Sequence, residues 1–424
     1  MVAKVIVKST SSMRRHAMLY ATAAVGVLVT VALVMLNGCG GSSATPAAQQ
    51  PPPSGSPSVV VGAVVQCTAD FYSNSAIPAV CHSATVTNCP NVSDLSLTYS
   101  YDTPASPKGT IVLLSGAGGT DDTGDVDFAG YYFTNGYEVI QIEWADEWEY
   151  TGGNDTNTSP ANVRLAACRG ATLLNFIFNT NNSTLYSGGG RCAQGSSAGS
   201  GAIAYALTFY GAGNYLDAVE MKSGPPIADF EQGCEEPNTI QTTICGTQNG
   251  GPQVGCQLGG TQPWTLSPMY TGAASGVRNW TNDKSCAVPG TTTSAASNQA
   301  WLQESIVNDG TGNPTYSYPK TAMTAWLCQS LFEGSQCVGG QGGMPQDFCP
   351  NNSTSQAEIY YAKLTSDSNN LPQSSYNIYA VQNCDGPEGV AGTDPTVAAI
   401  TVNGIPENGT IAIENDMLAQ CVKH

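Results

Sequence analysis

The sequence predicts an α/β protein built on a doubly wound, mostly parallel sheet. Short apolar runs alternate with amphipathic runs over residues 109–224, and further apolar runs follow near the carboxyl end. Apolar runs that end in glycine-rich sequence are typical of buried parallel strands followed by a loop. Strands that alternate with helices indicate a parallel sheet with helices on both faces.

Each element follows from its own pattern. We expect strands at 109–114, 137–144, 190–197, 216–224, 376–386 and 396–404, and helices within 125–136, 161–178, 198–211 and 409–422. Ser159 is a favourable N-cap and Pro160 a favourable first residue for the second helix, and Gly136 is suited to end the first. Residues 94–104 alternate in polarity, which predicts an antiparallel strand at the sheet edge.

The first 58 residues are not expected to join the fold. In 1–38, basic residues precede a long apolar run, as in a secretory signal, although a transmembrane anchor is the alternative. The end of this run, Leu-Asn-Gly-Cys39, resembles the bacterial lipobox, whose cysteine carries the lipid. Residues 39–58 are rich in Pro, Ser and Gly and predict a tether. We expect an extracytoplasmic protein, anchored to the bacterial cell envelope through lipid on Cys39 and contacting the membrane in no other way.

Cysteine usage and charge narrow the function classes. The chain has 15 cysteines; Cys39 apart, 14 remain, which predicts up to seven disulfides in an oxidising compartment. The absence of any CxxC pair argues against a zinc site. The formal charge is −18, and loss of the four basic residues of the leader takes it to −22. A surface this acidic repels phosphate backbones, so nucleic acid is excluded as the expected partner.

Residues 230–372 break the alternation of strands and helices. They are rich in Cys, Gly, Gln and Thr and contain four of the six tryptophans. We expect the folded core at 59–229 and 373–424, with 230–372 as a disulfide-rich insertion. Such an insertion is either a cap over the site or a structural subdomain, and the sequence leaves both open.

Residues 195–199 read Gly-Ser-Ser-Ala-Gly, the G-x-S-x-G pattern that places a nucleophilic serine on a sharp strand-to-helix turn. Together with "GTIVLLSGAGG" before it and "YAVQNCDGPEG" after it, this stretch resembles the α/β-hydrolase superfamily over most of 109–229 and 374–422. The resemblance implies an α/β-hydrolase-type sheet and a cofactor-free serine hydrolase of the carboxylic-ester class. It implies Ser197 as the nucleophile.

The other roles follow from the same resemblance. The oxyanion hole is expected from the backbone N–H of Ala198 and that of Ala117 or Gly118. The acid is expected after the fifth parallel strand, at Asp385, and the other acidic residues that could serve are Glu388 and Asp229.

The expected histidine is missing. The resemblance places it after the sixth strand, where this sequence has Asn403 or Gly404, and asparagine is no base near neutral pH. The chain's histidines are His16, His82 and His424. His16 belongs to the leader, and His424 is expected at the far edge of the sheet. His82 is the candidate base only if an N-terminal segment pinned by disulfides crosses the top of the sheet. Otherwise we expect Ser197 to have no histidine within hydrogen-bond reach.

Three functions stay open at this point. The first is an ester hydrolase that acts through an acyl-enzyme on Ser197, with a small-molecule or polymer ester as substrate. The second is a catalytically silent member of the fold that acts as a surface binding protein. The third is a secreted serine peptidase. A base within reach of Ser197 separates the first from the second.

Overall fold

The computed structural model describes residues 55–68, 71, 80–116, 119, 126–149, 163–179, 185–222, 224–225, 228, 299, 302–308, 310–329, 356–366, 376–382, 401–402, 405–406 and 409–423. The leader, most of the tether and Cys39 lie outside these ranges. Among the described helices, none has the length and apolar character needed to cross a bilayer.

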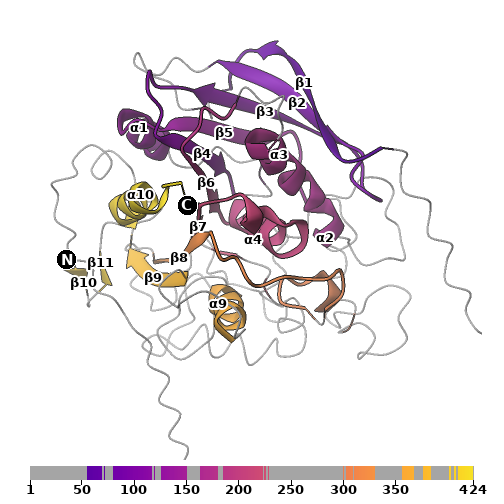
Figure 1. Ribbon diagram of the computed structural model, residues 1–424, viewed down its shortest axis with the longest axis vertical. Coiled ribbons are helices and arrows are strands. Elements are labelled where there is room, and N and C mark those ends of the chain that lie inside the picture. Colours follow the sequence, from indigo (N-terminus) through magenta and orange to yellow (C-terminus); the bar gives the residue numbers. More distant parts are fainter. Residues whose placement is uncertain are drawn as a thin grey trace, which may run out of the picture. The chain divides into compact units, whose positions relative to one another are not determined.

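Nine strands form one sheet in the order β1-β2-β3-β5-β4-β6-β7-β8-β9 (Figure 1). Their bounds are β1 Ser58–Val65, β2 Cys81–Thr87, β3 Leu95–Asp102, β4 Gly109–Leu114, β5 Glu138–Trp144, β6 Gly190–Ser196, β7 Ala218–Lys222, β8 Ala322–Gln329 and β9 Tyr376–Gln382. From β1 to β5 each neighbouring pair is antiparallel, whereas all pairs from β5 to β9 are parallel. The predicted mostly parallel sheet is confirmed.

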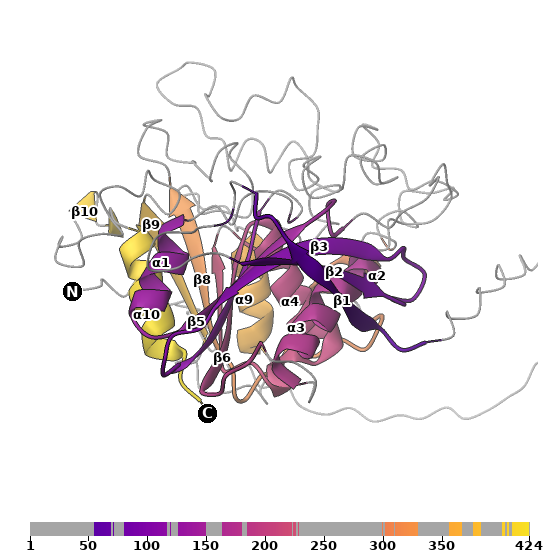
Figure 2. The same cartoon turned by 90° about the horizontal axis from the view of Figure 1, so that it is seen from above.

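Helices cover both faces of this sheet (Figure 2). Their bounds are α1 Val126–Thr134, α2 Val163–Ala166, α3 Cys168–Asn179, α4 Ala198–Tyr210, α9 Gln356–Ser366 and α10 Gly409–Gln420, with a 3-10 turn, η2, at Ala212–Asn214. Buried side chains of α1 and α10 form one cluster with the sheet, and those of α3, α4 and α9 form another on the opposite face. The sheet is therefore doubly wound, as predicted.

Strand β4 shows why a buried parallel strand can be predicted from its sequence. All six of its residues are buried. Ile111 and Leu113 belong to the cluster on the α1 and α10 face, whereas Val112 and Leu114 belong to the cluster on the α4 face. Because successive side chains point to opposite faces and both faces are covered, the strand is a continuous apolar run.

The sheet contains a strand that the sequence analysis places in the insertion. β8 pairs with both β7 and β9, and α9 contributes to the buried cluster beside it. Residues 230–372 are therefore not one insertion, since 302–308, 310–329 and 356–366 contribute to the core. The pattern hides β8 because Thr324 interrupts its apolar run and donates a hydrogen bond to Asp416 of α10 over 2.7 Å. The rest of the predicted cap lies outside the described residues.

Of the predicted strand at 396–404, the structure describes Thr401–Val402 (β10). Within the described residues it pairs with Ile405–Pro406 (β11) in a separate two-stranded sheet, so it is not a member of the nine-stranded one. The sixth parallel strand is β9. Residues 94–104 do contain an antiparallel strand, β3, but β2 and β1 lie beyond it, so β3 is not at the edge.

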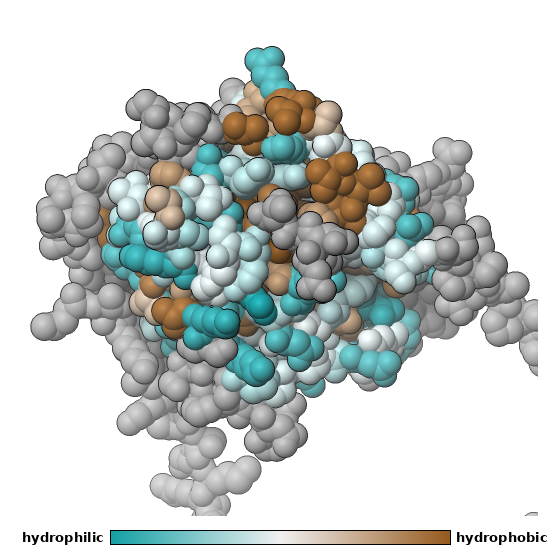
Figure 3. All heavy atoms as spheres, turned by 45° about the horizontal axis from the view of Figure 1, so that its top comes forward, coloured by the Kyte–Doolittle hydropathy of each residue, from teal (hydrophilic) through white to brown (hydrophobic). Residues whose placement is uncertain are grey.

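Strand β1 forms the outer edge of the sheet, and apolar surface gathers at this end of the molecule (Figure 3). Its valines Val60, Val61, Val64 and Val65 are exposed. A register irregularity between Val61 and Val64 interrupts its pairing with β2. Such bulges are one way in which proteins blunt an open strand edge.

Three disulfides close the described part of the chain. They are Cys67–Cys81, Cys89–Cys168 and Cys192–Cys421. All three join core elements, so they do not belong to the predicted cap. Disulfides persist in oxidising compartments, which favours an extracytoplasmic location for the folded domain.

Candidate active site

Ser197 stands alone between the end of β6 and the start of α4, with φ 49° and ψ −113°. Positive φ is a strained backbone conformation for a residue with a side chain, and such strain gathers at functional sites. The Ser197 N–H donates to the Lys222 carbonyl over 2.8 Å, and the Ser197 carbonyl accepts from the Gly201 N–H over 3.1 Å and from the Ser200 hydroxyl. The strand-turn-helix expected around this serine is present.

The two glycines of the motif are required by close backbone contacts. A Cβ on Gly195 would lie 2.4 Å from the Gly199 carbonyl carbon. A Cβ on Gly199 would lie 2.3 Å from the Leu114 carbonyl oxygen. Since no side chain fits at either position, the glycines let the first turn of α4 pack directly on β6 and on the end of β4.

The loop after β4 approaches the serine. A Cβ on Gly116 would lie 3.5 Å from the Ser197 Cβ. The Gly119 N–H donates to the Gly116 carbonyl over 2.6 Å, which closes a tight turn. Ala198, the other expected oxyanion donor, is fully buried at the first position of the 13-residue helix α4, where the helix dipole favours negative charge. Ala117 and Gly118 lie outside the described residues.

Two tryptophans that the sequence analysis did not select support this region. A Cβ on Gly119 would lie 2.4 Å from Cδ1 of Trp144 and 3.2 Å from Cδ1 of Trp148. The Trp148 indole N–H donates to the Ala198 carbonyl over 3.2 Å. The signal in the sequence is a pair of tryptophans four residues apart at the carboxyl end of a parallel strand, the edge where ligands bind in such sheets.

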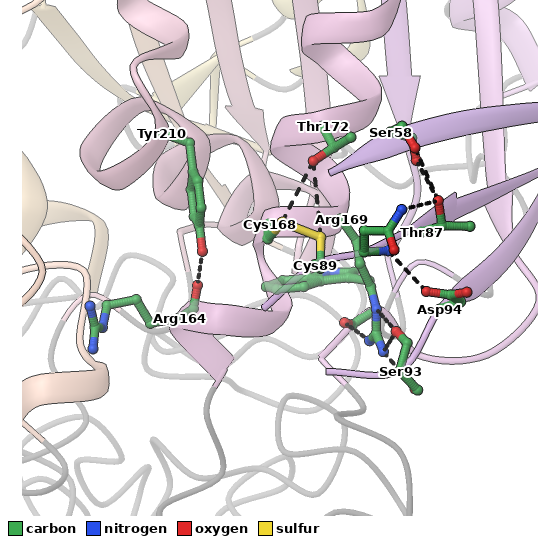
Figure 4. The surroundings of a disulfide bond; sticks show 12 residues. Ser58, Thr87, Cys89, Ser93, Asp94, Arg164, Cys168, Arg169, Thr172 and Tyr210 are labelled. Atoms are coloured by element: carbon green, nitrogen blue, oxygen red, sulfur yellow. Dashed lines mark hydrogen bonds between the residues drawn. A yellow bond between two sulfur atoms is a disulfide. The ribbon is translucent and has the colours of Figure 1, made fainter. Parts of the chain in front are cut away.

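Arg169 of α3 holds Trp148 in turn. Its guanidinium donates to the Trp148 carbonyl over 2.8 Å and to the Ser93 carbonyl and hydroxyl. It lies beside the Cys89–Cys168 disulfide and reaches toward Ser93 (Figure 4). Burial lowers the pKa of Arg169 to about 10, so its guanidinium stays charged at neutral pH.

His82 is not brought to Ser197. Register pairs run from His82 on β2 through β3, β5 and β4 to Gly195 of β6. Four strand spacings of about 4.8 Å separate the two positions, roughly 19 Å in all. Hydrogen-bond reach is about 3 Å, so the interpretation of His82 as the base is corrected.

His82 has a structural environment instead. Its ring lies 5.4 Å from that of Tyr99 and 5.6 Å from that of Tyr101, on the neighbouring strand β3. Its Nε2 is buried and has no hydrogen-bond partner among the described residues. His424 lies outside the described residues, and so does His16.

The strand count moves the expected acid and base positions. β8 is the fifth parallel strand and β9 is the sixth, so the loop expected to hold the acid begins at residue 330. Asp385 comes three residues after the end of β9, in the loop where the resemblance places the histidine. Asp385 therefore occupies a different loop from the one expected. It lies outside the described residues, as do the other positions considered, Glu388, Asp229, Asn403 and Gly404.

Two buried carboxyl groups lie on opposite faces of the sheet, Glu149 near Tyr205 of α4 and Glu220 near Asp416 of α10. Glu149 follows Trp148 directly and is buried, and its oxygens have no hydrogen-bond partner in the described part of the chain. Burial raises the pKa of Glu149 well above its usual value, and Glu147 raises it further. On the other face, burial raises the pKa of Glu220 well above its usual value. Both carboxyl groups are therefore held protonated more strongly than exposed ones.

No protein-family model matches the chain, and no curated protein matches it. Several solved structures are similar. Acetyl xylan esterase 1 from Thermoanaerobacterium sp. JW/SL YS485 is 11% identical over 77% of this chain and 83% of that one, with a TM-score of 0.42. Carboxyl esterase 2 from Tuber melanosporum is 9% identical over 83% and 90%, with a TM-score of 0.43. An esterase from Pyrobaculum calidifontis is 12% identical over 80% and 82%, with a TM-score of 0.40.

The chain's own geometry fits an α/β-hydrolase fold. The sheet is mostly parallel with helices on both faces, and a strained serine joins a central strand to a helix.

Proposed function

We propose that the chain is an extracytoplasmic serine hydrolase that cleaves carboxylic esters. The observation that carries the proposal is the strained Ser197 between β6 and α4, beside Gly116, where an added Cβ would lie 3.5 Å from the Ser197 Cβ. Strain in a serine at the carboxyl edge of a parallel sheet is the feature expected of an activated nucleophile. The substrate is a small-molecule or polymer ester.

The mechanism follows the geometry of the elbow. Ser197 Oγ attacks the ester carbonyl carbon, and the carbonyl electron pair moves onto oxygen. The N–H of Ala198, with that of Ala117 or Gly118, stabilises this oxyanion. The intermediate collapses to an acyl-enzyme, and the serine proton leaves with the departing alcohol. Water then cleaves the acyl-enzyme and releases the carboxylic acid.

The proposed site has no histidine base for Ser197 among the described residues. The described part of the chain brings no histidine to Ser197, and residues 330–408 contain none in the sequence. The strand order favours two carboxylates. Glu333 is the first acid after β8, where the acid is expected, and Asp385 follows β9, where the base is expected. An oxyanion hole without a base still gives roughly 10³–10⁴-fold acceleration over water, so we expect slow turnover.

The same observation supports a second candidate. A chain that keeps the fold and the elbow but lacks the base is a surface binding protein for an ester or a related ligand. Reaction with a phosphorylating probe separates the two candidates, because only an activated serine reacts readily.

The test uses a fluorophosphonate probe on the whole mature chain. We expect one label per chain, placed on Ser197 by peptide mass spectrometry, and none on Ser197→Ala. Slow hydrolysis of p-nitrophenyl acetate should disappear in the same variant. A folded wild-type chain that takes up no label overturns the hydrolase and supports the binding protein.

The location is part of the proposal. Three core disulfides favour an oxidising compartment, and Cys39 is the residue that would carry the lipid. Palmitate labelling of cells should mark the wild-type protein and not Cys39→Ala. Equal labelling of both overturns the lipid anchor without affecting the assignment of Ser197.

A further inference from the structure

We propose that Trp148 is a positioning residue that fixes the two sides of the oxyanion hole relative to each other. This inference rests on the proposed hydrolase function. The Trp148 side chain does not touch the reacting atoms. It acts through the backbone N–H groups that are expected to bind the oxyanion.

Trp148 bonds one of these backbone segments and lies next to the other. Its indole N–H donates to the Ala198 carbonyl, 3.2 Å away, at the first position of α4. A Cβ on Gly119 would lie 3.2 Å from the Trp148 Cδ1, so the indole leaves no room for a side chain there. The Gly119 N–H donates to the Gly116 carbonyl, and a Cβ on Gly116 would lie 3.5 Å from the Ser197 Cβ. Trp148 therefore links the start of α4 to the Gly116–Gly119 segment that approaches the serine.

Tryptophan is suited to this place by shape and by its donor. The side chain is fully buried and packs edge-on against Tyr205 of α4, with ring centroids 6.1 Å apart. Its single N–H donor finds an acceptor, as buried indoles usually do. A phenyl ring keeps most of the packing and loses the bond to Ala198.

The backbone of Trp148 is fixed as well. The buried Arg169 donates to its carbonyl over 2.8 Å and also holds Ser93. The adjoining Cys168 is linked to Cys89. Charge-assisted bonds of this kind are stronger than neutral ones, so the indole has a rigid support.

Preorganisation is the reason why this matters for rate. Backbone donors stabilise an oxyanion only if they already point at the place where charge develops. A small error in the distance between Ala198 and the Gly116 turn weakens both donors in the transition state. It leaves ground-state binding of the ester almost unchanged.

The experiment compares Trp148→Phe with Trp326→Phe. Trp326 is the matched control because it is equally buried but lies in the cluster on the opposite face, against Tyr379. We expect both variants to lose thermal stability. Only Trp148→Phe should lower the fluorophosphonate labelling rate and kcat, by about tenfold for one lost hydrogen bond and with KM unchanged.

A second variant covers the case in which Trp148→Phe does not fold. Trp148 replaced by 3-benzothienylalanine keeps the two-ring shape and has sulfur in place of the N–H. It should show the same loss of kcat at constant KM. A wild-type labelling rate in a folded Trp148 variant overturns the positioning role and leaves the hydrolase intact. A wild-type chain that takes up no label overturns both.

Discussion

The hydroxyl of Thr324 on β8 donates to the carboxyl of Asp416 on α10 over 2.7 Å, in the interior between sheet and helix. Glu220 of β7 faces the same carboxyl group and is fully buried. Burial raises the pKa of Glu220 well above its usual value and also raises the pKa of Asp416. Glu414 on α10 is a further charged neighbour of Glu220, and Lys222 comes two residues later on β7. The interior beneath α10 is thus a carboxyl cluster that favours bound protons.

This cluster makes stability depend on pH in a defined direction. A carboxyl group whose pKa is raised by folding adds stability below its unfolded pKa, about 4, and loses it as pH rises through the folded pKa. We expect the urea midpoint of the wild-type chain to fall from pH 4 to pH 8. Glu220→Gln carries no charge at any pH, so its midpoint should fall less and exceed the wild-type midpoint at pH 8. A steeper fall in the variant contradicts this account.

Replacing Glu138 by glutamine is expected to have the opposite effect on stability from Glu220→Gln. Glu138 is buried at the start of β5, and its carboxylate accepts hydrogen bonds from Thr103 and Thr110 over 2.6 Å each and from both the N–H and the hydroxyl of Ser187. Glu138→Gln replaces an acceptor oxygen with a donor, so we expect a loss of about 2 kcal/mol at pH 7. Chemical denaturation measures it. If Glu138→Gln stabilised the fold as Glu220→Gln is expected to do at pH 8, the two buried carboxyl groups would not differ in the way proposed.

The strain at Ser197 is measurable. Its positive φ costs nothing to glycine, so Ser197→Gly should be more stable than Ser197→Ala by about 1–2 kcal/mol. Both variants lack the hydroxyl and should take up no fluorophosphonate. Equal denaturation midpoints for the two variants would show that the elbow stores no strain.

The motif glycine at 199 is expected to be irreplaceable. Its Cβ would lie 2.3 Å from the Leu114 carbonyl oxygen, so Gly199→Ala should destabilise the fold by about 3 kcal/mol or more. Gly170→Ala, in the interior of α3, is the control. Its Cβ would meet only the Ala202 Cβ at 3.4 Å, and alanine favours a helix by about 1 kcal/mol over glycine. Thermal melts that rank the two variants the other way would contradict the close contact.

His82 should be dispensable for chemistry. His82→Phe keeps an aromatic ring against Tyr99 and Tyr101 and removes a buried Nε2 for which the described residues offer no partner. We expect an unchanged rate of Ser197 labelling and unchanged or slightly higher stability. A large drop in labelling rate with an intact fold would restore His82 as the base.

The sequence predicts the parts of this fold whose apolar residues are continuous. β4 is such a strand, with all six residues buried, and the turn at Ser197 follows from a motif with a steric cause. β8 is not predicted because its apolar run contains Thr324, which hydrogen-bonds to Asp416 of α10, a residue far away in the sequence. Because β8 is missing from the prediction, Asp385 is expected in the acid loop. With β8 counted, the acid loop is the one after β8, and Asp385 lies beyond β9.

The site is predictable only in its local part. Gly195, Ser197 and Gly199 are close in sequence, and their spacing carries the geometry. The place of His82 depends on how β2 pairs, and strand pairing leaves no local signal. The role of Trp148 depends on where β5 ends relative to α4 and the Gly116 turn. Such relationships arise only when the sheet is assembled.

The Cys192–Cys421 disulfide joins the strand that leads to Ser197 with the residue just beyond α10. It closes a covalent ring of chain that includes β7, β8 and β9. A protease that cuts any one bond inside this ring releases no fragment. A nicked molecule therefore runs as a single band on a gel without reductant and as two bands with it. Proteolytic maturation or damage of this protein would go unnoticed unless the disulfide is first reduced.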